Sequence, residues 1–227
     1  MKRALWIMML MLFVACPVIQ AQEPTPPPNA ATPEALPPLT AEDSFQLAVK
    51  AFQSGDLAGS ERHARTAIAL KSRYVEAHYL LGRILVFRAA QKTRLLIEQR
   101  GDAGAVLPRE ANWPAGENEL QDAIAQFRTV IKLDPSNTDA WLLLATALDN
   151  LGQNEDAVNA YRQTINLNPA SRNARDAHNN LGLVFRQQKK FEEAKDEFEA
   201  ALALDPTFQP ARLNLEKLKK QKPKLFR

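Results

Sequence analysis

Apolar residues along most of this chain recur with the period of an α-helix, in stripes separated by short polar turns. The clearest stripe holds apolar side chains at positions i, i+3, i+4 and i+7. These residues are Trp141, Leu144, Ala145 and Leu148. Gly152 interrupts the pattern, and a second stripe follows at Ala157 and Tyr161. The pattern therefore predicts two amphipathic helices joined by a tight turn.

The helical pattern repeats at a nearly constant interval. Pro135, Pro169 and Pro206 each follow an Asp or Asn and close an apolar run. Pro135 and Pro169 are 34 positions apart, and Pro169 and Pro206 are 37 apart. A period of this length indicates a helical repeat architecture, in which each helix pair buries its apolar face only against its neighbours.

Two of the repeating units resemble the tetratricopeptide repeat family. The family pattern is an aromatic residue, Leu-Gly, a second aromatic, then Ala, an aromatic, Ala and a closing Pro within about 34 positions. Residues 138–171 fit this frame with Ala145 at the usual Gly position, and residues 175–208 fit it with Gly182 in place. Residues 172–174 separate the two units. The resemblance implies an all-α fold, a right-handed superhelical solenoid of helix-turn-helix repeats.

An earlier unit is split by an insertion. Ala194 follows Gly182 by 12 positions, whereas their counterparts Ala123 and Gly82 are 41 positions apart. The excess of 29 residues lies at about residues 88–117. Its first part continues the helical pattern, and its apolar residues are Leu95, Leu96, Ile97 and Trp113. These side chains either pack back on the solenoid or form a second contact surface.

The expected repeat domain spans residues 41–221. Its four repeats are residues 41–74, 75–137, 138–171 and 175–208, and a C-terminal capping helix occupies residues 209–221. A basic tail follows at residues 222–227. We interpret this tail either as a frayed, soluble end or as a contact with an anionic envelope surface.

The first residues have the pattern of an export signal. Two basic residues precede an apolar run over residues 4–15, which is too short to cross a hydrocarbon core of about 30 Å as a helix. Cleavage after Ala21 would make residues 1–21 a signal peptide. Cys16 ends a sequence that resembles the bacterial lipobox, where the cysteine is acylated, and an uncleaved anchor is the third alternative. Each alternative places the rest of the chain in the periplasm or cell envelope.

Residues 22–40 separate this signal from the repeats. They hold seven prolines and few large apolar side chains, which favours an extended, disordered linker. The linker serves either as a semi-rigid spacer or as a proline-rich ligand for another module.

Composition and motifs exclude several functions. Cys16 is the only cysteine, so a disulfide framework and a cysteine-based zinc site are excluded. The sequence lacks the metalloprotease, P-loop, nucleophile-elbow and dinucleotide-binding motifs. His78 and His178 occupy the same repeat position and are interpreted as packing residues. We therefore expect no enzymatic activity, no catalytic residue, no metal and no cofactor.

The family resemblance also implies a concave groove, lined by the first helix of each repeat, that binds partner segments. Its N-terminal positions are aromatic and apolar, and its C-terminal positions are polar. The predicted partner-binding residues are Phe45, Phe52, Tyr79, Arg83, Phe87, Asn150, Asn179 and Arg186. Some family members clamp a C-terminal carboxylate, but here Phe45, Val49 and Leu143 stand in clamp-type positions, so such a clamp is not expected.

These features predict a non-catalytic protein-interaction module that binds a peptide or protein segment and acts as an adaptor or assembly factor in the cell envelope. The alternative is a lipid-anchored structural component of an outer-membrane or pilus assembly complex, attached through Cys16. A nucleic-acid partner is not expected, because no aromatic residue interrupts the basic tail before Phe226. Any membrane association is expected to run through the N-terminus.

Overall fold

The structure is a computed structural model that describes residues 39–99 and 116–226. The described residues all belong to one compact unit, Leu39–Arg227. The expectations for the signal peptide, Cys16, Trp113 and most of the proline-rich linker therefore lie outside the described residues. Every regular element within the described ranges is helical, which confirms the predicted all-α fold.

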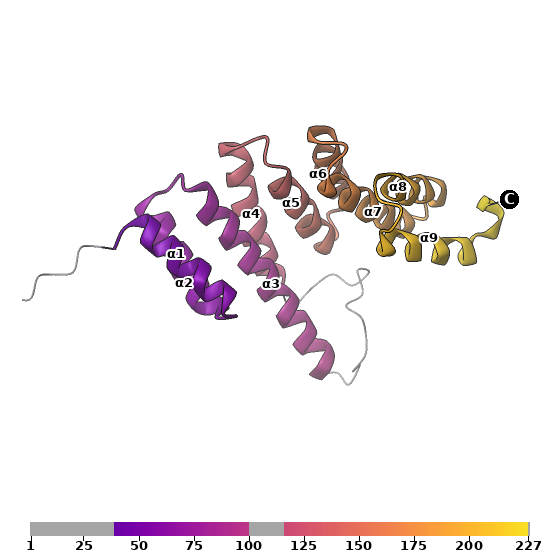
Figure 1. The fold of residues 1–227 in the computed structure, drawn as a ribbon. Helices are drawn as coiled ribbons and strands as arrows, with labels where there is room; N and C mark the ends of the chain where they lie inside the picture. Colours follow the sequence, from indigo (N-terminus) through magenta and orange to yellow (C-terminus); the bar gives the residue numbers. More distant parts are fainter. Residues whose placement is uncertain (1–38, 100–115, 227) are drawn as a thin grey trace, which may run out of the picture. The chain divides into compact units, whose positions relative to one another are not determined.

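The helices follow one another along the chain (Figure 1). They are α1 (Ala41–Gln53), α2 (Leu57–Leu70), α3 (Val75–Gln99), α4 (Glu117–Leu133), α5 (Thr138–Asn150), α6 (Asn154–Leu167), α7 (Arg172–Gln187), α8 (Phe191–Leu204), α9 (Gln209–Gln221) and the short 3-10 helix η1 (Pro223–Phe226). Thr40, Asn137 and Ser171 cap the starts of α1, α5 and α7 by accepting hydrogen bonds from backbone N–H groups. Within residues 39–99 and 116–226, no helix combines the length and apolar character needed to cross a membrane.

Each helix packs mainly against its neighbours in sequence. The helices pair as α1 with α2, α3 with α4, α5 with α6 and α7 with α8, and each pair contacts the next. The first helices of the pairs also touch one another in the series α1, α3, α5, α7 and α9. This arrangement is the stacked helix-pair architecture of a solenoid, and it places α1, α3 and α5 side by side.

The helices of a pair approach closely where a small residue faces an aromatic ring. A Cβ atom built on Gly82 would lie 2.6 Å from the ring of Phe127, and one built on Gly182 would lie 2.6 Å from the ring of Phe198. Both rings are fully buried. Glycine at these two positions therefore leaves the space that the aromatic side chain of the second helix fills.

The turns inside the pairs use a left-handed backbone conformation. Gly55 and Gly152 have φ of 82° and 74°, a region that costs a residue with a Cβ atom about 1–2 kcal/mol. Lys189 stands at the corresponding turn between α7 and α8 and has φ of 62°. The turn therefore keeps its conformation without glycine, at a cost in backbone strain.

Helix α3 extends well beyond the repeat frame because the first part of the insertion is helical. Its extension is held from two sides by ion pairs, from Arg88 to Glu61 of α2 and from Lys92 to Glu119 of α4. The side chain of Leu95 is 51% exposed. Of the apolar insertion residues, Leu95 therefore does not pack back on the solenoid, and the side chains of Leu96 and Ile97 lie outside the described set.

Two C-terminal features differ from the expectations. Residues 172–174 are not a spacer between units, because α7 begins at Arg172 and they form its first turn. The interpretation of the tail as frayed is wrong for residues 223–226. These residues form η1, and the half-buried Phe226 packs against the core. Cation–π contacts from Lys195 and Lys219 to the Phe226 ring, at 5.2 and 5.9 Å, help to keep it there.

Candidate functional site

The first helices of the solenoid enclose a pocket of about 600 Å³ near the N-terminal end of the repeat domain. Its apolar walls come from α1 and α3, and its polar rim includes the turn before α5 and the start of α5. The lining residues are Phe45, Val49, Phe52, Gln53, Val75, Glu76, Tyr79, Leu80, Arg83, Asp134, Asn137 and Asp139. The helical repeat places these side chains together because α1, α3 and α5 contact one another in series.

An arginine lies among aromatic rings in this pocket. The Arg83 guanidinium is 5.1 Å from the ring centre of Phe52 and 5.8 Å from that of Tyr79. Phe87 packs edge-on against Phe52, with the ring centres 5.7 Å apart. No carboxylate of the described residues lies within ion-pair distance of Arg83. The rings therefore hold the arginine in place while its N–H donors stay available to a ligand.

Carboxylates line the opposite side of the pocket. Asp139 accepts a hydrogen bond of 2.9 Å from Asn173 of α7, and hydrogen bonds from Ser136 hold the pKa of the Asp134 carboxyl below its usual range. Burial raises the pKa of the Tyr79 hydroxyl, and the negative charge of Asp139 raises it further. At neutral pH the pocket thus presents a cation, carboxylates and a neutral phenol around an apolar floor.

Tyr74, in the turn before α3, fixes the outer wall of the pocket. Its ring lies 5.1 Å from that of Phe45, and its hydroxyl donates a hydrogen bond to Glu42. Burial, followed by this hydrogen bond, raises the pKa of Tyr74 to about 12, and the same bond lowers the pKa of Glu42. Phe45 is therefore supported by an ordered neighbour and cannot swing freely out of the pocket.

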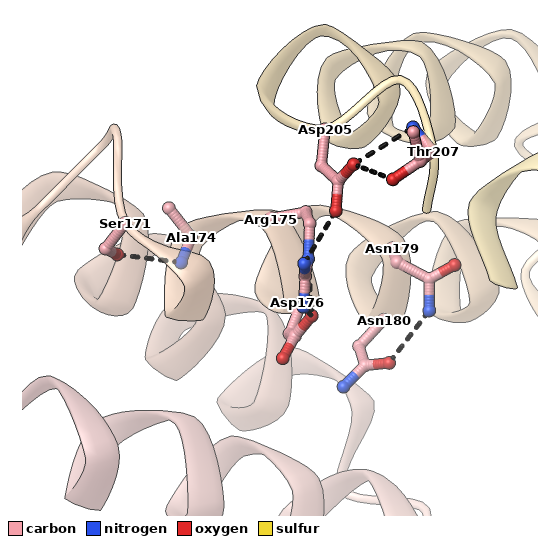
Figure 2. Close-up of polar contacts among 8 residues, drawn as sticks. All are labelled: Ser171, Ala174, Arg175, Asp176, Asn179, Asn180, Asp205 and Thr207. Carbon is pink, nitrogen blue, oxygen red and sulfur yellow. Dashed lines mark hydrogen bonds and ion pairs between the residues drawn. The ribbon is translucent and has the colours of Figure 1, made fainter. Parts of the chain in front are cut away.

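The C-terminal part of the same face is occupied by contacts within the chain. Figure 2 shows Arg175 of α7 between two carboxylates, to which it donates hydrogen bonds of 2.7 Å (Asp176) and 2.8 Å (Asp205). Asn179 lies beside Asn180 in the same view, and it also accepts a hydrogen bond of 2.9 Å from Asn214 of α9. Helix α9 thus covers α7 and uses the polar groups that this part of the face offers.

Comparison with known families decides what this architecture is. Residues 115–152 and 142–207 match the family model described as tetratricopeptide repeat. Residues 115–207 of the chain are thus tetratricopeptide repeats. The repeat frame seen in the sequence, with its small residues facing aromatic rings, is the same frame that the structure displays as stacked helix pairs.

Solved structures share this tetratricopeptide repeat fold. A MamA protein has a TM-score of 0.61 and 20% identity, with 82% of this chain and 87% of that chain covered. TTC0263, a thermophilic tetratricopeptide repeat protein of Thermus thermophilus, has a TM-score of 0.57 and 17% identity, covering 80% and 82%. Pseudomonas aeruginosa pilF has a TM-score of 0.60 and 18% identity, covering 81% and 69%. A search of curated proteins gives no match. At these identities the likeness shows the fold.

Helices α1 and α3 bring together four of the residues predicted to bind a partner, namely Phe45, Phe52, Tyr79 and Arg83. Phe87 adjoins them and is 55% exposed. Asn150 is buried at the C-terminal end of α5, and Asn179 is buried under α9. Arg186 is half-buried near the end of α7. The role of all these residues in binding stays a prediction.

Sequence reasoning missed the part of the pocket that comes from outside the first helices. Asp134 and Asn137 belong to the turn between α4 and α5, whereas the family pattern points only to positions on first helices. The Asp-Pro signal at residue 134 marks a helix end, and it gives no indication that this end faces a pocket.

The histidines at equivalent repeat positions make equivalent contacts. His78 of α3 bonds to Gln126 of α4 at 2.7 Å, and His178 of α7 bonds to Glu197 of α8 at 2.6 Å. In both cases the histidine links the two helices of one pair. Among the residues that the structure describes, no group of three or more His, Cys, Asp or Glu side chains is placed to hold a metal.

Proposed function

We propose that this protein is an adaptor that binds an extended segment of a partner protein in the pocket formed by α1, α3 and α5. The family indicates a protein-interaction module, and its members are in general non-catalytic scaffolds. The observation that carries the proposal is the pocket itself, in which an arginine that forms no ion pair with the described residues lies between aromatic side chains.

The walls of the pocket suit an apolar side chain of the partner. Phe45, Val49 and Phe52 are only partly buried although they stand next to the core, so a ligand can remove further apolar area from water. Aromatic residues and arginine are the types most often found at the energetic centre of interfaces. We assign the anchoring role to Phe45, Phe52, Tyr79 and Arg83.

The charges on the rim set the orientation of the bound segment. Arg83 can donate a pair of hydrogen bonds to a carboxylate or a backbone carbonyl of the segment. Glu76, two turns before Arg83 on α3, and Asp139 of α5 favour a positively charged group further along the pocket. A segment that places an apolar residue between an acidic and a basic group matches both sides.

We further propose that the adaptor works in the periplasm or cell envelope. The support is the sequence pattern of the first residues, an apolar run followed by a proline-rich stretch. The mass of the N-terminal peptide of the native protein tests this proposal. A chain that starts at Gln22 supports export with simple cleavage, a diacylated Cys16 supports a lipid anchor, and an intact Met1 in a cytoplasmic fraction refutes the proposal.

The binding role is tested by selecting peptides from a random display library against the compact unit Leu39–Arg227. The affinity of the selected peptides is then measured for the variant Arg83→Glu and for the control Arg62→Glu. Arg62 is exposed on α2 and makes the same charge change away from the pocket. Circular dichroism establishes that both variants are folded.

We expect Arg83→Glu to weaken binding at least about tenfold, since a charge-assisted contact contributes about 1.5–3 kcal/mol. The control should bind as the unchanged domain does. Peptides that bind both variants equally would show that the pocket is not the binding site.

A further inference from the structure

A dense group of lysines lies at the C-terminal end of the repeat domain, away from the pocket. We call it the C-terminal lysine patch. Its members, all exposed, are Lys189, Lys190, Lys217, Lys219, Lys220, Lys222 and Lys224. They come from the turn between α7 and α8, the last turns of α9 and η1. Residues 217–226 contain five of these lysines and no acidic residue.

The patch stands on ordered structure. η1 is held against α8 and α9 by cation–π contacts of Lys195 and Lys219 with the Phe226 ring. Lys195 Nζ also donates a hydrogen bond of 3.4 Å to the Leu225 carbonyl. The ammonium group of Lys222 lies 4.5 Å from the ring centre of Phe191. These contacts bring the end of α9 and η1 onto the start of α8, so lysines distant in sequence share one surface.

The positive charge of the patch is not balanced locally. Within residues 39–99 and 116–226, no carboxylate lies within 4.0 Å of any of the seven ammonium groups. Glu192 and Glu193 are the acidic residues that line the same hollow of about 550 Å³. The exposed Glu216 precedes Lys217 on α9. Seven lysines against these three glutamates leave a net positive charge at this end of the domain.

We propose that the C-terminal lysine patch binds the surface of an anionic phospholipid bilayer. Lysine carries a compact, hydrated charge on a flexible stem, which suits a surface with many mobile phosphates, whereas shape-specific recognition of one phosphate more often uses arginine. The hollow between the lysines has apolar walls from Phe191, Pro223 and Leu225, so these residues can lie against the headgroup region while the ammonium groups contact phosphate.

The contact is independent of the adaptor pocket. No helix contributes to both surfaces, because the pocket is built from α1, α3, the turn before α5 and α5 itself. A domain held at a bilayer through its C-terminal end would therefore keep the pocket available to a partner.

Vesicle sedimentation with the compact unit Leu39–Arg227 tests the proposal, because this unit lacks the apolar N-terminal run. One set of vesicles contains phosphatidylcholine alone, and the other contains phosphatidylcholine mixed with phosphatidylglycerol. We expect binding only to the second set at about 0.1 M salt and loss of binding near 1 M salt, where the Debye length falls from about 10 Å to about 3 Å.

Two matched variants locate the contact. The patch variant combines Lys189→Gln, Lys217→Gln, Lys220→Gln and Lys224→Gln, whose side chains make no ion pair or ring contact with the described residues. The control combines Lys50→Gln, Arg62→Gln, Arg73→Gln and Lys132→Gln. It removes the same charge from α1, from α2, from the turn that precedes α3, and from α4, respectively. Each lysine near an anionic surface contributes about a fivefold gain in affinity, so the patch variant should bind more than about tenfold more weakly and the control less than about threefold.

Three results would overturn the proposal. The first is that the patch variant and the control lose the same affinity for anionic vesicles. The second is that the domain binds neutral and anionic vesicles equally well. The third is that the domain binds no vesicles but binds a single-stranded oligonucleotide through the same lysines. The last result would assign the patch to a nucleic acid. Failure of the lysine patch would leave the peptide-binding experiment unaffected, since that experiment depends on Arg83.

Discussion

The close approach of α7 and α8 makes Gly182→Ala the sharpest test of how the repeats are packed. A Cβ atom at this position would lie 2.6 and 2.8 Å from two ring atoms of Phe198, and 3.1 Å from the carbonyl oxygen of Ala194. Ordinary carbon–carbon contacts lie at about 3.5–4.0 Å. The ring is fully buried and one of the three neighbours is backbone, so the two helices must move apart by a large part of an ångström.

Two opposing effects set the size of the change in stability. Replacing glycine by alanine inside a helix favours the folded state by about 0.5–1 kcal/mol. An extra methyl group in a filled core costs about 1–3 kcal/mol. Because the contact distances are far below the ordinary range, we expect the packing cost to win. The free energy of unfolding should therefore fall by about 1–2 kcal/mol.

Urea unfolding followed by circular dichroism measures this change as a lower midpoint at an unchanged slope. The double variant Gly182→Ala with Phe198→Leu is the control, because leucine removes the ring atoms that the new methyl group meets. The second substitution should cost less in the alanine background than in the wild-type background. A Gly182→Ala domain that is more stable than the wild type would refute the packing argument, since helix propensity alone would then suffice.

Three further predictions concern backbone strain and ionisation. Lys189→Gly should raise the free energy of unfolding by about 1 kcal/mol in urea, because glycine adopts the left-handed turn without steric cost; a loss of stability would contradict this. For Glu119, burial raises the pKa, but the hydrogen bond and charge of Lys92 outweigh burial and hold the pKa below its usual value. The stability that Glu119 provides should thus be present above about pH 4.3, its pKa in an unfolded chain, and be lost as the pH falls further, and thermal melts should show a weaker acid dependence in Glu119→Gln. Tyr74, with its pKa raised to about 12, should favour folding in its protonated form and lose that effect as the pH rises from about 10. In ultraviolet titration, the Tyr74→Phe variant should lack one phenol that ionises well above pH 10 in the wild type. Ionisation of the Tyr74 phenol near pH 10 would contradict the assignment.

The fold class could be predicted from the sequence because the same packing pattern, a small residue on a first helix facing an aromatic residue on the second, recurs along it. Gly82 and Gly182, with aromatic residues sixteen positions further on in the uninterrupted unit, mark where a second helix crosses the first. Such a signal depends only on local spacing and helical period. The resemblance to the tetratricopeptide repeat family rested on this spacing, and the comparisons confirm it.

The candidate site could be predicted only in part. Phe45, Tyr79 and Arg83 were indicated by their positions on first helices, and the structure brings them together in one pocket. The contribution of Asp134 depends on how the turn before α5 approaches α3, which is a property of the stack and not of any single repeat. Asn179 illustrates the converse, because its bond to Asn214 spans 35 residues and follows from the docking of α9.

The C-terminal end shows the same limit. The run of lysines was interpreted either as a frayed, soluble tail or as a contact with an anionic envelope surface. Phe226 prevents fraying by docking beside Lys195 and Lys219. A single aromatic residue near the end of a chain therefore decides whether a charged stretch is ordered, and its docking partner cannot be read from local spacing.

Among residues 39–99 and 116–226, each helix packs against helices no more than two places away in the series. This has a consequence for how the protein can change over evolutionary time. A new helix pair can be gained, or the last one replaced, with new contacts needed at one junction only. The walls of the pocket would keep their shape through such an event, because α1, α3 and α5 take no support from α8 or α9. The two ends of the domain are thus free to acquire and lose functions separately, because the described helices at one end make no direct contact with those at the other.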